Sequence, residues 1–251
     1  MIVREQGEQL FLISQPHHSA IAGHIAGHWK VTNFRGFDQL ESVLFIIGAH
    51  DHCWREADAA PLLNTATGRP YSFDDYPEDR KIKLYAKGVD DIEKTNPYAA
   101  WLCSRHFGSF FETAGKGPAQ EYYLQEIARQ TRLEQQLIRQ GHDLSAGDYH
   151  FNLLQFCDNL SLFICLNEAG LDQHPWFRDG FAGSEKLGVD SRVLNATWKN
   201  QETLKISPFP FDMEFNTDLE YRTLPTNLSS QEELDQLWRA APVQTQTIRF
   251  I

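Results

Sequence analysis

Five segments between residues 14 and 170 place apolar side chains at the spacing of one helical face, and this pattern constrains the fold more than any other feature. Asp38 and Glu41 form a capping-box arrangement before the second segment, and Pro97 occupies the favoured first position of the third. Glycines follow the last two segments, as they often follow helices. The predicted helices cover residues 15–29, 39–54, 97–112, 118–140 and 148–169.

The rest of the chain shows weaker patterns. Residues 2–13 alternate in polarity around a turn, which would suit a short hairpin. Residues 57–96 are rich in Pro, Gly, Asp and Thr and are expected to form a long irregular segment. After residue 171 the β-prone runs "WKNQETLKISPFPF", "LEYRTL" and "VQTQTIRFI" predict strands. The expected fold is mainly α: one domain over 1–251, with a helical bundle at about 14–170 and a small antiparallel β element at about 195–251.

Composition narrows the possible partners and the location. The chain has 251 residues, 41% of them hydrophobic, and a formal net charge of −11. This charge, with no basic cluster, argues against nucleic acid or an anionic membrane surface as a partner. No export signal or run of about 18 apolar residues is present, so a cytoplasmic location is expected. The four cysteines form no CxxC pair and are expected to be reduced core residues. A homo-oligomer is compatible with the sequence.

Four of the predicted helices direct an ionisable residue into an otherwise apolar face. His18 continues the face of Ala22 and Ile25, whereas its neighbour His17 does not, so His18 is expected to point inward. The others are His50 and Asp51 after the apolar run 43–47, His106 between Leu102 and Phe110, and Asp158 between Leu154 and Leu162.

A buried histidine on its own is more often a hydrogen-bonded core residue than a ligand, and Asp51 and Asp158 could instead cap a helix or pair with Arg105. However, an unpaired carboxylate in the interior costs several kcal/mol or becomes protonated. A divalent cation would compensate two carboxylates and accept two neutral imidazoles at once. We therefore expect a metal ion (Mn, Fe, Ni, Co or Zn) bound by His18, His50, Asp51 and Asp158.

The order H…HD…D of these residues resembles the HD superfamily of metal-dependent phosphohydrolases. The resemblance implies an HD-domain-like helical bundle, metal binding by the four residues, and hydrolysis of a phosphate ester. The chain is also similar to a narrower bacterial family of unknown function, on the segments "QPHHSAIAG", "HDHCW", "NTATGRPYSF", "SRH" and "DNLSL". Neither His142 nor His150 fits the second additional histidine of binuclear HD enzymes, so one metal is expected.

The function expected on this basis is a metal-dependent hydrolase for a small phosphorylated, nucleotide-like molecule. His106 could orient the attacking water or protonate a leaving group, and Glu56 could act as an acid or base. The expected substrate-binding residues are Arg105, Asn64, Arg69 and Trp54, with the segment around residues 64–77 as a lid.

Structural, non-catalytic interpretations of these residues also remain open. Arg105, Arg69 and Glu56 could be solvated surface charges, and residues 64–77 could be an ordinary turn-rich connection. The alternative function is a catalytically inactive HD-like module that binds a small ligand or a protein. A metal oxygenase is less favoured, since a second additional histidine is missing.

Overall fold

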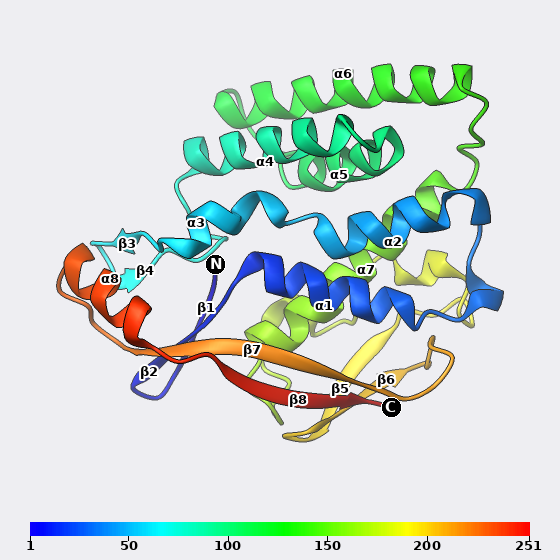
Figure 1. Cartoon of the computed structure of the whole chain (residues 1–251). Coiled ribbons are helices and arrows are strands. Elements are labelled where there is room, and N and C mark those ends of the chain that lie inside the picture. The colour runs from blue at the N-terminus through cyan, green and yellow to red at the C-terminus, as the bar shows by residue number, and fades with distance from the viewer.

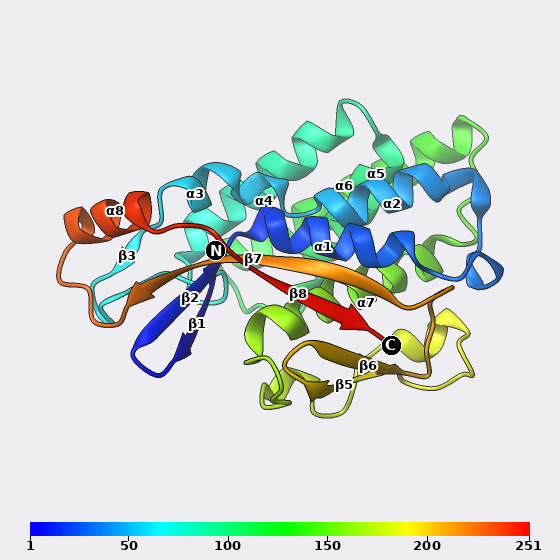
Figure 2. The same cartoon turned by 60° about the horizontal axis from the view of Figure 1, so that its bottom comes forward.

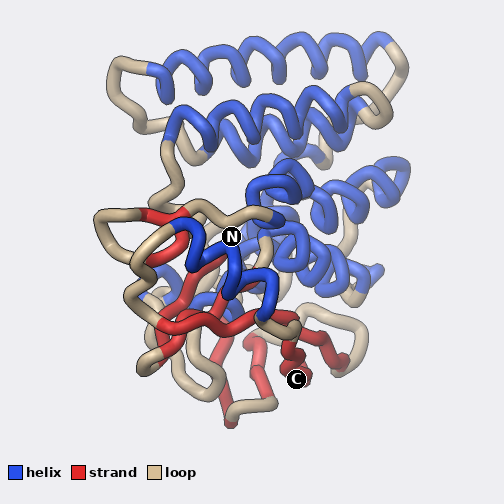
Figure 3. The backbone as a smooth tube through the Cα atoms, turned by 60° about the vertical axis from the view of Figure 1, so that its left-hand side comes forward, coloured by secondary structure: helices blue, strands red, loops and turns tan.

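The computed structural model describes all residues, 1–251, and contains a large sheet in addition to the helices. Half of the residues are helical and 19% lie in strands. The helices stack on one side of a curled sheet, with α6 farthest from it (Figures 1 and 3). The expected mainly α class is therefore wrong: the protein is α/β.

The sheet has six strands in the order β1-β2-β7-β8-β6-β5. The β6–β8 pairing is parallel and the others are antiparallel. Strands occur in the regions where the sequence predicts them, but the first hairpin pairs with the C-terminal strands through β2 and β7. Sequence periodicity can indicate a strand but cannot indicate which distant strand it pairs with. The C-terminal strands were therefore expected to form a small separate element. The strands are β1 (Ile2–Gln6), β2 (Gln9–Ile13), β5 (Asn195–Asn200), β6 (Thr203–Ser207), β7 (Phe215–Pro225) and β8 (Gln244–Phe250).

Five long helices coincide with the predicted helical segments. Side-chain caps begin two of them: Ser14 accepts a hydrogen bond from the His17 amide at 3.2 Å, and Asn96 accepts one from the Ala99 amide at 3.0 Å. The helices are α1 (Gln15–Gly27), α2 (Leu40–Ala49), α5 (Pro97–Ser109), α6 (Pro118–Arg139) and α7 (Gly147–Leu166).

The second helix is shorter than predicted, and its capping box is absent. Asp38 lies in a 3₁₀ turn, η2 (Phe37–Gln39), and no side chain caps α2. The helix stops at Ala49, and His50 and Asp51 connect it to a second 3₁₀ turn, η3 (His52–Trp54), and to α3 (Arg55–Ala59). The two candidate ligands therefore lie at a break between helices.

The segment expected to be irregular contains a two-stranded hairpin and a helix of 16 residues. The hairpin is β3 (Leu63–Asn64) with β4 (Arg69–Pro70), and the helix is α4 (Glu78–Glu93). The buried residues Tyr85 and Val89 of α4 lie on one face of the helix. Most residues around them are charged, so the sequence shows no clear apolar periodicity here. A further helix, α8 (Gln231–Ala240), was also missed and lies beside β3 at one end of the molecule (Figure 2).

Close contact between α1 and α2 positions the helices that carry His18 and His50. Gly23 of α1 faces Gly48 of α2, and a Cβ atom on Gly23 would lie 2.6 Å from the Cα atom of Gly48. Glycine at this crossing lets the two backbones approach closely. None of the helices combines the length and the apolar character that a membrane-spanning segment needs. All four cysteines are free thiols, as expected.

Candidate metal centre

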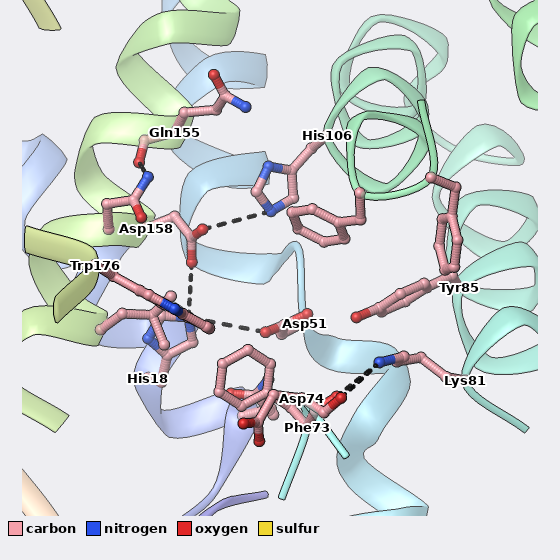
Figure 4. A pocket seen from close by; sticks show the side chains of 15 residues that line it. His18, Asp51, Phe73, Asp74, Lys81, Tyr85, His106, Gln155, Asp158 and Trp176 are labelled. Atoms are coloured by element: carbon pink, nitrogen blue, oxygen red, sulfur yellow. Dashed lines mark hydrogen bonds and ion pairs between the residues drawn. The ribbon is translucent and has the colours of Figure 1, made fainter. Parts of the chain in front are cut away.

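The four predicted ligands lie close together in the structure, at a point where α1, α7 and the end of α2 meet. His18, Asp51 and Asp158 are shown in Figure 4. The Nε2 atom of His18 lies 2.9 Å from Asp158 Oδ1, and that of His50 lies 3.3 Å from the same oxygen. Asp51 Oδ2 lies 3.8 Å from His18 Nε2 and 3.7 Å from His50 Nε2. The predicted orientation of His18 is confirmed: it is 1% exposed, whereas His17 is half-buried and accepts a hydrogen bond from the Glu220 amide.

These separations suit a small cation surrounded by the four groups. With bonds of about 2.1 Å to nitrogen or oxygen, neighbouring ligand atoms lie roughly 3.0 Å apart in octahedral geometry and roughly 3.4 Å apart in tetrahedral geometry. The four separations between a histidine nitrogen and a carboxylate oxygen, 2.9–3.8 Å, lie close to these values. Asp51 groups with His18 and His50, whereas Asp158 groups with His50 and His106, so the two carboxylates do not belong to one set of mutually close ligand atoms. A single ion held by all four groups would therefore take the two carboxylates on opposite sides.

Hydrogen bonds hold the two histidine rings with Nε2 directed at the centre. His50 Nδ1 donates to the Ile47 carbonyl at 2.9 Å, and His50 Nε2 has no hydrogen-bond partner. The Ser161 hydroxyl donates to the Asp158 carbonyl at 2.8 Å, so its oxygen can accept from His18 Nδ1 at 2.7 Å. Partners of this kind fix the tautomer and orientation of metal-binding histidines. His50 Nε2 is thus directed at the centre without a hydrogen-bond partner, whereas His18 Nε2 is hydrogen-bonded to Asp158 Oδ1 at 2.9 Å, a contact that a bound metal ion would replace.

The electrostatics of the cluster favour a bound cation. Burial lowers the pKa of His50, but the carboxylates of Asp51 and Asp158 outweigh this effect and raise it to about 9. Burial also raises the pKa of Asp51. For Asp158, burial acts in the same upward direction, but contacts with His18 and His50 hold its pKa well below the usual range. The carboxylates thus stabilise a positive charge between the rings, and a divalent ion would replace the proton held there.

His106 of α5 adjoins the cluster from the side of the outer helices. Its Nε2 atom lies 3.7 Å from Asp158 Oδ2, and its Nδ1 atom has no hydrogen-bond partner. Burial lowers the pKa of His106 to about 3, so the ring is neutral at physiological pH. His106 also groups with His50 and Asp158 as a possible ligand set. It can therefore complete a coordination sphere or contact a molecule bound beside the metal.

The other predicted site residues lie elsewhere, because each has a separate local role or faces another surface. Arg105 pairs with Asp148 at 2.6 Å and stacks on Trp101 and Phe151. Arg69 forms an ion pair with Glu5.

Asn64 hydrogen-bonds Asp75 in the β3–β4 region. Trp54 packs within the core against Tyr76 and Tyr85. Glu56 is exposed and lines a different depression, on the other side of His50. The two remaining internal histidines also bind elsewhere: His150 contacts Tyr98 and the Arg35 carbonyl, and His142 contacts Gln39.

A cavity of about 300 Å³ opens onto the metal centre, and sequence analysis missed most of its walls. His18, Asp51, His106 and Asp158 form its floor. Helix α4 supplies Lys81 and Tyr85, which lie one helical turn apart and are visible in Figure 4. The four-residue spacing of Lys81 and Tyr85 could have predicted that both side chains face the cavity. That inference requires residues 78–93 to be identified as a helix first. The remaining lining residues are Gln15, Phe73, Asp74, Phe110, Phe111, Gln155, Asn159, Leu162 and Trp176.

The fold and the site define an α/β protein with a buried His/Asp centre at the floor of a cavity. A family model described as "Protein of unknown function (DUF3891)" matches residues 1–226, and the chain belongs to this family. No curated protein and no solved structure matches the chain. The expected HD-domain assignment is wrong: no HD family model matches, and the six-stranded sheet is not part of an HD helical bundle. The H…HD…D order reflects the positions of four buried His and Asp residues and does not identify that superfamily.

Proposed function

We propose that the protein is a metal-dependent hydrolase whose metal is held by His18, His50, Asp51 and Asp158. The observation that carries the proposal is the unpartnered Nε2 atom of His50, which is buried and lies 3.3–3.7 Å from two carboxylates. A buried polar atom without a partner is costly, and a metal ion would remove that cost for this atom. The open cavity that His18, Asp51 and Asp158 line leaves room for water and a substrate.

A divalent cation bound here supplies an acidified water molecule and polarises a substrate oxygen. Groups of the protein itself orient the water molecule and the two histidine ligands. His106 is neutral and lines the cavity, so it can accept a hydrogen bond from the attacking water. Because its pKa is low, its role is to orient that water more than to store the proton. Ser161 orients His18, and the Ile47 carbonyl orients His50.

We do not propose a phosphate ester as the substrate of this protein. That expectation came from the HD resemblance, which the family match does not support. Neither Arg69 nor Arg105, the residues expected to bind phosphate, lines the cavity. A cytoplasmic location stays a prediction.

Metal analysis tests the proposal. The protein is purified without chelators or a metal-affinity column and then incubated with Mn, Fe(II), Ni, Co or Zn. We expect about one tightly bound ion per chain, with loss of binding in Asp51→Asn and Asp158→Asn. Asp74→Asn is the matched control for metal content: Asp74 is exposed at the same cavity but is not among the four groups.

Hydrolysis is then measured with the loaded protein on a panel of nitrophenyl esters and anilides. No bound metal, or equal binding in all three variants, would refute the metal centre. Stoichiometric metal without any turnover would refute the hydrolase and favour the ligand-binding module.

A further inference from the structure

One wall of the cavity carries a tyrosine hydroxyl that none of the chain's hydrogen bonds involves. Tyr85 is 3% exposed, and its ring stacks on Phe107 with centroids 4.0 Å apart. Stacking fixes the direction of the phenol, and its hydroxyl points toward Asp51 (Figure 4). The side-chain oxygen of Gln15, which is 2% exposed and lines the same cavity, also has no partner. Two buried polar groups are therefore available to a molecule bound beside the metal.

The opposite part of the cavity is aromatic and apolar. The rings of Phe73 and Trp176 meet edge to face with centroids 6.0 Å apart, and Phe111 and Leu162 lie deeper. Trp176 is 54% exposed although it lines the cavity, so it stands at the opening. An apolar group about the size of one aromatic ring would remove this surface from water when it binds.

The residues around the cavity provide no uncompensated positive charge for a doubly charged anion. In formal charge, a divalent ion would be balanced by Asp51 and Asp158, and Lys81 is offset by the neighbouring carboxylate of Asp74. The Lys81 ammonium is also bound to the Phe73 carbonyl at 3.0 Å. No arginine lines the cavity. A phosphate dianion would bring two negative charges without compensation, whereas a neutral acyl compound brings none.

We propose that the substrate is a carboxylic ester or amide with an aromatic or branched apolar group, and that Tyr85 donates a hydrogen bond to its carbonyl oxygen. This inference rests on the proposed hydrolase function. Water oxygen adds to the carbonyl carbon, and the bond to the leaving oxygen or nitrogen breaks with its electron pair on that atom. A proton from the water ends on the leaving group, and the other product is the carboxylic acid. Negative charge develops on the carbonyl oxygen, where a donor such as Tyr85 is most effective.

The test uses metal-loaded protein and three ligands measured by calorimetry: benzohydroxamate, acetohydroxamate and phenyl phosphate. The hydroxamates are metal-binding mimics of an acyl group, with and without the aromatic ring. We expect benzohydroxamate to bind at least about ten-fold more tightly than phenyl phosphate. Tyr85→Phe should weaken benzohydroxamate about five-fold, the usual effect of losing one hydrogen bond. Trp176→Ala should weaken benzohydroxamate and leave acetohydroxamate unchanged.

Tyr122→Phe is the matched control, because Tyr122 is also buried with an unpartnered hydroxyl but does not line the cavity. It should bind all three ligands as the natural protein does. Tighter binding of phenyl phosphate than of benzohydroxamate, or equal effects of Tyr85→Phe and Tyr122→Phe, would overturn this inference. Metal content and turnover of the unmodified protein separate the two proposals: absence of bound metal, or bound metal without turnover, refutes the hydrolase, whereas turnover with the wrong order of ligand affinities refutes only the substrate class.

Discussion

Replacing Ser161 by alanine tests whether the hydrogen-bond chain behind His18 serves metal binding. Ser161 is fully buried on α7, where its oxygen lies 2.7 Å from His18 Nδ1 and 2.8 Å from the Asp158 carbonyl. The substitution removes the acceptor for the His18 ring N–H and leaves that group buried. Leaving a buried donor unpaired costs about 1–3 kcal/mol. Loss of such a partner lowers metal affinity by about 10–100-fold, which corresponds to a similar energy.

The measurement is thermal unfolding with and without metal, together with a chelator competition for the affinity. At a metal concentration of about 100 times Kd, binding stabilises the natural protein by about 2.7 kcal/mol. For a chain of this size that raises Tm by roughly 5–11 °C. At the same concentration Ser161→Ala should keep only about 0.4–1.4 kcal/mol of this stabilisation.

Ser104→Ala is the control for a general effect of removing a buried hydroxyl. Ser104 is equally buried on α5, and its hydroxyl contacts Glu126 and Gln130, away from the metal centre. This variant should keep the full increase in Tm on metal addition. An unchanged affinity in Ser161→Ala, or equal losses in both variants, would refute the role assigned to Ser161.

Three further predictions concern packing and surface chemistry. Gly23→Ala should lower the free energy of unfolding by about 1–3 kcal/mol in urea titrations, because its Cβ would clash with Gly48. Gly27→Ala on the same helix, where a Cβ meets nothing within 4 Å, should be neutral or slightly stabilising, and equal effects at both positions would contradict the clash. Arg105→Ala should leave metal affinity unchanged and cost about 1–3 kcal/mol of stability, mainly from its lost stacking on Trp101 and Phe151, since its partner Asp148 is exposed and that ion pair contributes little; a loss of metal would place Arg105 in the site after all. Burial raises the pKa of all four thiols, so none should react with a thiol reagent at pH 8 in the folded protein and all four should react in denaturant; a fast-reacting thiol in the folded state would contradict this.

Local sequence patterns determined the long helices and the inward direction of the candidate metal ligands. The phase of His18 relative to Ala22 and Ile25 distinguishes it from His17, because residues three and four positions apart share a helical face. The same periodicity places His106 and Asp158 on buried faces. These features depend on neighbours within two turns, which is the range over which a sequence pattern reports structure.

Only the tertiary structure decided how the two ends of the chain combine and what surrounds the metal centre. Strand β2 pairs with β7, about 200 residues later, and no local pattern encodes that partner. The helix breaks after Ala49, although periodicity alone continued it to residue 54. Helix α4 brings Tyr85 to the cavity. The apolar face of this helix is short, and it is recognised only from its packing against the core. The sequence thus identified the inward-facing candidate ligands, whereas long-range packing selected the sheet, the cavity and the residues that line it, since those depend on contacts between distant segments.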